Sequence, residues 1–138
     1  PRLRMSRFRN PSSIHVMNRY VDQLTNNAVT IHDVDCIFRN HAKEFWCMFE
    51  WKNLSESQSR AGTMQSLNEL DEAFNNADAD YKGLFIVRLG FHVGDWELDD
   101  DKMIEVQHIS GGVIAGHKTY ETGARSALQY ILDHGRLL

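Results

Sequence analysis

The sequence has little cysteine and no long hydrophobic run, and both absences exclude classes of protein. Its 138 residues include only two cysteines, Cys36 and Cys47, which are too few for a disulfide framework and form no C-x-x-C pair. We therefore expect a reducing, cytoplasmic setting. No apolar run approaches the roughly 20 residues that a membrane-spanning helix needs, so we expect no membrane partner. The seven histidines form no H-E-x-x-H or H-x-H pattern, so a zinc site is not indicated.

The chain also lacks the excess positive charge that is typical of nucleic-acid-binding proteins. Its 15 Lys and Arg residues stand against 19 Asp and Glu residues, which gives a net charge of −4. Residues 1–10 contain four of the arginines and no acid, so the rest of the chain is more acidic still. Such a body needs local basic patches or bound cations to contact a polyanion. We expect residues 1–10 to be a basic, flexible arm that is no secretory signal, and residues 11–138 to form a single domain.

Hydrophobic periodicity predicts alternating helices and strands after this arm. The predicted elements are a helix over 13–26, strands over 28–38 and 44–52, a helix over 56–76, strands over 83–91 and 102–109, and a last helix from Ala124 that ends at Gly135. This α-β-β-α-β-β-α order predicts an α/β fold with a central mixed sheet flanked by helices.

Two other stretches resemble binding motifs without their spacing. Residues 111–119 contain glycines and a lysine like a phosphate-binding P-loop, but His117 stands between the last glycine and Lys118. We interpret them as a glycine-rich turn between a strand and the last helix. The acidic residues of 95–101 lack the glycine and the terminal glutamate of a calcium-binding EF-hand, so we interpret them as a solvated turn.

The most informative residues lie on the hairpin predicted from the first two strands. Asp35 is in the first strand, and Glu50-Trp51-Lys52 ends the second. Because side chains alternate along a strand, Glu50 and Lys52 share a face and Trp51 lies on the other. A register in which opposing numbers sum to 83 places Asp35 diagonal to Glu50, within about 7–8 Å, and sets the two cysteines opposite each other. Any odd sum keeps the two carboxylates on one face, whereas an even sum separates them.

Two carboxylates and one ammonium group at such a place have a clear chemical use. Mg²⁺ prefers oxygen ligands and keeps several waters, so an open two-carboxylate site suits it. The ion lowers the pKa of a bound water and polarises a phosphoryl oxygen, while a nearby lysine positions the water or stabilises negative charge. The pattern therefore points to metal-assisted phosphodiester hydrolysis. The alternative is that the three residues are strand-end charges in a surface ion pair.

The same residues resemble the signature of the PD-(D/E)XK nuclease superfamily, an Asp followed by Glu/Asp-x-Lys on a β-hairpin. The resemblance covers about residues 13–92 and implies a restriction-endonuclease-like α-β-β-α-β core. It implies that Asp35 and Glu50 bind Mg²⁺, with Mn²⁺ as an alternative ion, and that Lys52 is the catalytic lysine. Asp35 fits the pattern better than Asp33 because an apolar pair follows it.

The resemblance also implies supporting residues and a substrate. A polar residue on the helix after the motif often assists catalysis in this superfamily, and Gln58 and Gln65 are the candidates here. DNA is the expected substrate, RNA is the alternative, and a nuclease this small often forms a homodimer. Independently of the resemblance, candidates for contacting phosphate are basic residues of the arm, of a helix start and of the glycine-rich stretch, namely Arg7, Arg9, Arg60 and Lys118.

Two other functions are compatible with the sequence. The first is a binding or regulatory module that keeps the nuclease fold without catalysis, which the acidic body favours. The second is a virus- or phage-type accessory protein with no role on nucleic acid.

Overall fold

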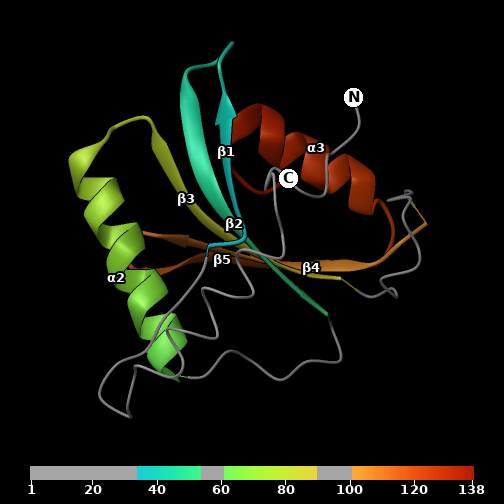
Figure 1. Ribbon diagram of the computed structural model, residues 1–138. Coiled ribbons are helices and arrows are strands. Elements are labelled where there is room, and N and C mark those ends of the chain that lie inside the picture. The colour runs from blue at the N-terminus through green and yellow to red at the C-terminus, as the bar shows by residue number, and fades with distance from the viewer. Residues whose placement is uncertain (1–33, 54–60, 90–100) are drawn as a thin grey trace, which may run out of the picture. The chain divides into compact units, whose positions relative to one another are not determined.

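A computed structural model describes residues 34–53, 61–89 and 101–138, all of which belong to one compact unit spanning residues 32–138. The elements in this part of the chain are β1 (Cys36–Asn40), β2 (Phe45–Asn53), α2 (Ala61–Ala77), β3 (Tyr81–Leu89), β4 (Ile104–Ser110), β5 (Val113–Tyr120) and α3 (Ala124–His134) (Figure 1). Neither of these two helices is long and apolar enough to cross a membrane.

The five described strands form one mixed sheet in the order β1-β2-β3-β4-β5. Sequential strands pair antiparallel except β2 and β3, which run parallel. Parallel neighbours need a crossover connection, and α2 lies in the connection between these two strands (Figure 1). The α/β class and the mixed sheet flanked by helices are therefore as predicted.

The two helices cover opposite faces of the sheet (Figure 1). On the α2 face, Leu67 of the helix packs against a core that includes Met48 and Ile86. On the α3 face, Ile131 packs against a core that includes Phe49. Because both faces are covered, β2 is buried continuously from Phe45 to Glu50, and its sequence is apolar without alternation.

The prediction for residues 111–119 was wrong. Only Gly111 and Gly112 form the turn, with φ of 66° and 79°, and the chain then returns as β5. Positive φ at both central residues is what a two-residue hairpin turn requires, and glycine adopts it without strain. The order of the described elements is therefore β-β-α-β-β-β-α, one strand more than predicted after β3. β5 is an edge strand that is exposed over most of its length, so no buried periodicity marks it.

The other boundaries shift by a few residues. Strand β3 begins at Tyr81, two residues before the predicted start, and β1 begins at Cys36 within the predicted strand over 28–38. Helix α3 ends at Gly135 as predicted, because this glycine has a φ of 66° and its N–H donates to the Ile131 carbonyl oxygen at 2.7 Å. The predictions of a basic arm over residues 1–10 and of a helix over 13–26 lie outside the described residues.

A buried carboxylate joins α2 to the sheet through hydrogen bonds. Asp71 of α2 is fully buried and accepts hydrogen bonds from the Tyr81 hydroxyl and, at 2.8 Å, from the Gly112 N–H. Its two donors come from β3 and from the β4–β5 turn, so they offset the cost of burying the carboxylate. Burial and the neighbouring Asp71 raise the pKa of Tyr81, which keeps its hydroxyl protonated as the donor. The crossover helix is thereby held on the face that carries the candidate site.

Candidate functional site

The hairpin register brings the two predicted metal ligands together. Cys36 lies opposite Phe49 and Asn40 opposite Phe45, so opposing residue numbers sum to 85 rather than to the predicted 83. The sum is odd, as the site requires, and Asp35, immediately before β1, lies across from Glu50 instead of diagonal to it.

The turn explains the difference of two residues in the register. Glu44 adopts a φ of 56°, and the Asn40 side-chain oxygen accepts the Lys43 N–H at 3.0 Å, which closes the chain over four residues. The predicted strands over 28–38 and 44–52 instead left residues 39–43 as the turn. The predicted opposition of the cysteines was therefore also wrong, and no disulfide joins the two thiols.

Reciprocal hydrogen bonds hold the two carboxylates in place. The Asp35 N–H donates to Glu50 Oε1 at 3.1 Å, and the Trp51 N–H donates to Asp35 Oδ2 at 2.8 Å. Each side chain thus binds the backbone of the opposite strand through one oxygen. The other oxygen of each carboxylate could serve as a metal ligand, so the pair could hold one cation from both sides.

Burial and mutual repulsion disfavour full ionisation of the two carboxyl groups. Glu50 is only 8% exposed, whereas Asp35 is exposed. Burial, and then the charge of Asp35, raise the pKa of Glu50 from an ordinary value of 4.5 to about 7, against the lowering effects of the Asp35 N–H and the Lys52 charge. A divalent cation between the carboxylates would take the place of the proton that the pair otherwise holds near neutral pH.

Lys52 lies where the sequence predicted it. Residues alternate along β2, so Lys52 shares the α2 face with Glu50 and Met48. Trp51 points to the other face, where its ring stacks on Phe49 at a centroid distance of 5.3 Å. The two carboxylates and the ammonium group therefore lie on one face, at the end of the hairpin where β2 and β3 both finish.

Of the other predicted site residues, the structure describes only Gln65 and Lys118. Gln58, Arg7, Arg9 and Arg60 lie outside the described residues. Gln65 is exposed on α2 and donates to Glu69 Oε1 at 3.2 Å. Lys118 lies opposite Val106, a core residue of the α3 face, and donates to the Leu138 main-chain oxygen at 3.0 Å. The structure thus places Lys118 on the other face of the sheet from Glu50, and its contact with nucleic acid stays a prediction.

Arg88 of β3 was not among the predicted site residues. Its register partner on β2 is Lys52, so the two cationic side chains are neighbours on the α2 face. An ion pair of 3.8 Å joins Arg88 Nη1 to Glu105 Oε1, and His117 Nε2 lies 2.9 Å from the same oxygen. The sequence feature that could have identified Arg88 is its positive charge inside the otherwise apolar run of residues 84–89.

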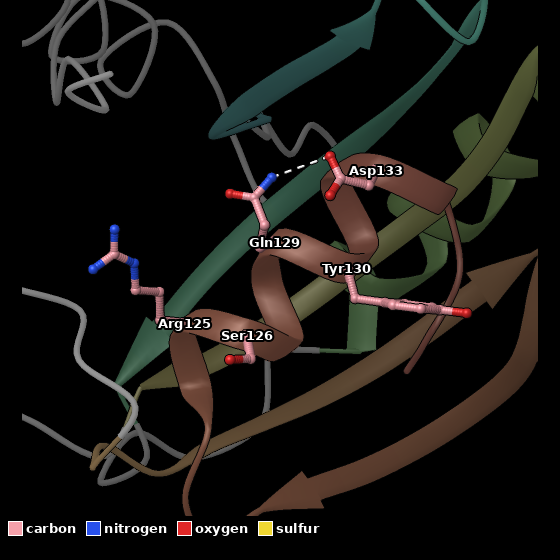
Figure 2. A pocket seen from close by; sticks show the side chains of 5 residues that line it. All are labelled: Arg125, Ser126, Gln129, Tyr130 and Asp133. Atoms are coloured by element: carbon pink, nitrogen blue, oxygen red, sulfur yellow. Dashed lines mark hydrogen bonds between the residues drawn. The ribbon is translucent and has the colours of Figure 1, made fainter.

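A concave surface lies on α3, away from the carboxylates. A hollow of about 520 Å³ is lined by five residues of α3, namely Arg125, Ser126, Gln129, Tyr130 and Asp133 (Figure 2). Gln129 Nε2 donates to Asp133 at 3.1 Å. This hollow belongs to the helix that covers the opposite face of the sheet, so it is not part of the candidate site.

Among the described residues, the carboxylate pair of Asp35 and Glu50 is the candidate for holding a metal ion. Within residues 34–53, 61–89 and 101–138, no three His, Cys, Asp or Glu side chains form a group that could hold an ion. Two carboxylates with water completing the shell fit Mg²⁺, which keeps several of its waters when bound.

Comparison of the chain with protein-family models, with curated proteins and with solved structures finds no match.

Proposed function

We propose that this protein is a Mg²⁺-dependent phosphodiester hydrolase that cleaves DNA and belongs to the PD-(D/E)XK type. One observation carries the proposal: Asp35 and Glu50 face each other across the end of a hairpin, with Lys52 on the same face. Surface ion pairs do not bury a carboxylate against a second carboxylate, so the arrangement favours a cation-binding role over ordinary strand-end charges.

The connectivity around the site supports a restriction-endonuclease-like core. The hairpin β1–β2 is followed by α2 and by β3, which pairs parallel to β2. The resemblance implies this strand-strand-helix-strand sequence, with the acid-x-Lys triplet at the end of the strand before the helix. In this chain Glu50 and Lys52 occupy that place.

Each residue has a defined role in the proposed reaction. Asp35 and Glu50 hold the ion, and the hydrogen bonds to the opposite strand fix where their oxygens point. Mg²⁺ supplies Lewis-acid activation of a phosphoryl oxygen and of a water molecule. Lys52 orients the attacking water and stabilises the negative charge that develops on the phosphorus oxygens.

A cleavage assay with a matched lysine control tests the proposal. The protein is incubated with single-stranded DNA, duplex DNA or RNA in Mg²⁺, Mn²⁺ or EDTA. Lys82 is the control residue because Asp80-Tyr81-Lys82 has the same acid-x-Lys pattern but lies at the other end of β3. We expect cleavage of DNA in Mg²⁺ and Mn²⁺ but not in EDTA. Because one preorganised group at a reacting centre contributes about 10²- to 10³-fold, K52A should lose at least about 100-fold and K82A should stay within about 2-fold.

Cleavage in EDTA, or equal loss in K52A and K82A, would contradict the proposal. No cleavage of any substrate in any condition would remove the enzymatic claim. Salt-dependent DNA binding without cleavage would instead favour the non-catalytic binding module.

A further inference from the structure

Trp51 lies between Glu50 and Lys52 in the sequence, but its side chain points to the other face of the sheet. On that α3 face the half-buried ring stacks on Phe49 at a centroid distance of 5.3 Å and an interplanar angle of 8°. Phe49 is 1% exposed and stacks in turn on Phe85 of β3 at 5.5 Å. The ring of Trp51 therefore holds the end of β2 on the α3-face core.

The main chain of Trp51, by contrast, contacts the carboxylate pair. Backbone N–H groups point along the sheet towards the neighbouring strand, and the Trp51 N–H donates to Asp35 Oδ2 at 2.8 Å. The ladder between β1 and β2 ends at Cys36 and Phe49, so Asp35 lies just beyond it. Two hydrogen bonds connect Asp35 to β2 there, namely this one and the bond from its own N–H to Glu50 Oε1 at 3.1 Å.

The Trp51 N–H therefore orients the Asp35 carboxylate. The bond between them is exposed to solvent, so water competes for both of its groups. Such a bond keeps its geometry only while its donor is held in place, and the stacked ring holds the donor from the other face of the sheet. Groups that orient a metal ligand through a hydrogen bond affect metal affinity without touching the ion.

We propose that Trp51 is a positioning residue of the ion site: its ring, packed on the α3-face core, fixes the N–H that orients the Asp35 carboxylate. This inference rests on the proposed function and adds a residue whose side chain contacts neither the ion nor the substrate. The acid-x-Lys signature leaves the residue between the acid and the lysine unspecified, so the role follows from the contacts of this chain alone.

The test compares two aromatic residues that contact the same ring. Phe38 of β1 packs edge-on against Phe49 at a centroid distance of 6.4 Å, but it lies opposite Cys47 inside the ladder, away from the carboxylates, so F38A is the matched control. Isothermal titration with Mn²⁺ measures the affinity of each variant. W51A should bind about 10-fold more weakly than the wild type, the lower end of the range for losing a group that orients a metal ligand. W51F, which keeps a flat ring on Phe49, should recover most of the affinity, and F38A should stay within about 2-fold.

Cleavage kinetics separate positioning from chemistry. Because Trp51 acts on the ion through Asp35, W51A should need about tenfold more Mn²⁺ for half-maximal cleavage of duplex DNA, and its rate at saturating Mn²⁺ should return to within about 3-fold of the wild type. W51L keeps apolar bulk but cannot stack, so it should show the same shift and replaces W51A if that variant does not fold.

Amide hydrogen exchange, followed by NMR in EDTA, reports on the bond to Asp35 without an ion. The N–H of residue 51 should exchange faster in W51L than in the wild type, because its donor position is no longer held. The same N–H in F38A should exchange as it does in the wild type.

The failures of the two proposals are distinguishable. If the wild type binds Mn²⁺ and cleaves DNA, and W51A and W51L bind Mn²⁺ as tightly as it does, Trp51 has no positioning role and the proposed function stands. An equal loss of affinity in F38A and W51L would also overturn the inference, because it would reflect a general loosening of the α3-face core. If the wild type neither binds Mn²⁺ nor cleaves, the proposed function fails, and equal hydrogen exchange at residue 51 in W51L, F38A and the wild type would overturn the role of Trp51 as well.

Discussion

Replacing Glu50 with glutamine should stabilise the fold at pH 8. Glu50 has a pKa of about 7 in the folded protein against 4.5 ordinarily, because it is buried beside Asp35. A carboxyl group whose pKa is raised by folding contributes stability that is fully present below pH 4.5 and is lost as the pH rises through 7. This difference between the folded and the ordinary pKa corresponds to a destabilisation of at most ~3 kcal/mol when Glu50 is ionised. Solvent screening at the open end of the hairpin reduces this destabilisation to about 1–2 kcal/mol.

The assay is urea denaturation followed by tryptophan fluorescence, in EDTA, on wild type and E50Q at several pH values. E50Q keeps an oxygen that accepts the Asp35 N–H but removes the charge. At pH 8 its unfolding free energy should exceed that of the wild type by about 1–2 kcal/mol, and this advantage should vanish towards pH 4.5. Burial lowers the pKa of His108, which has the opposite pH dependence, but both proteins contain it and the difference cancels its effect.

A constant difference between wild type and E50Q from pH 8 to pH 4.5 would refute this reasoning. A less stable E50Q at pH 8 would also refute it, because it would mean that the ionised carboxylate is well accommodated without a cation. In either case the carboxylate pair would not need a cation on electrostatic grounds.

Three further predictions concern the scaffold and the buried thiol. D71A should lower the free energy of unfolding, measured by urea denaturation, by about 2–4 kcal/mol, because it leaves the Tyr81 hydroxyl and the Gly112 N–H without their acceptor. A loss below ~0.5 kcal/mol would mean that Asp71 does not hold α2 on the sheet. G112A should lower the free energy of unfolding by about 1–2 kcal/mol in the same assay, since Gly112 has a φ of 79° and an added Cβ would lie 3.2 Å from Glu72 Cβ. An unchanged denaturation midpoint would contradict this prediction. Burial raises the pKa of the Cys47 thiol to about 12, so Cys47 should react with a thiol reagent at pH 8 only on unfolding, whereas the partly exposed Cys36 can react in the folded protein. Fast labelling of Cys47 itself in the folded protein, located by peptide mapping, would be inconsistent with the described core.

The parts of the fold that the sequence predicts well are those buried on both faces. The long apolar side chains from Phe45 to Phe49 mark β2, and those from Leu84 to Val87 mark β3, because only central strands of a covered sheet tolerate such runs. Strand β5 has no comparable signal, because an edge strand that is exposed over most of its length has no pattern of burial. The glycine pair Gly111-Gly112 before it is compatible with a tight turn and also with a longer loop, so the composition did not show that a strand follows.

The candidate site is predictable in part for a similar reason. Alternation along one strand places Glu50 and Lys52 on a common face without knowledge of the fold. The partner across the hairpin depends on the turn, where the positive φ of Glu44 decides the register, and the sequence does not reveal that angle. Arg88 comes next to Lys52 only through parallel pairing across the α2 crossover, which is a tertiary contact.

If Asp35 and Glu50 hold one divalent cation between them, the ion should bind in solution with a stoichiometry of one. Isothermal titration of the wild type with Mn²⁺ and with Mg²⁺, beside D35N, E50Q and the K82A control, measures stoichiometry and affinity. We expect one site per chain in the wild type and in K82A. Each carboxylate variant should lose at least about tenfold in affinity, because each removes a charged ligand. Equal binding by all four proteins, or no binding by the wild type, would contradict it.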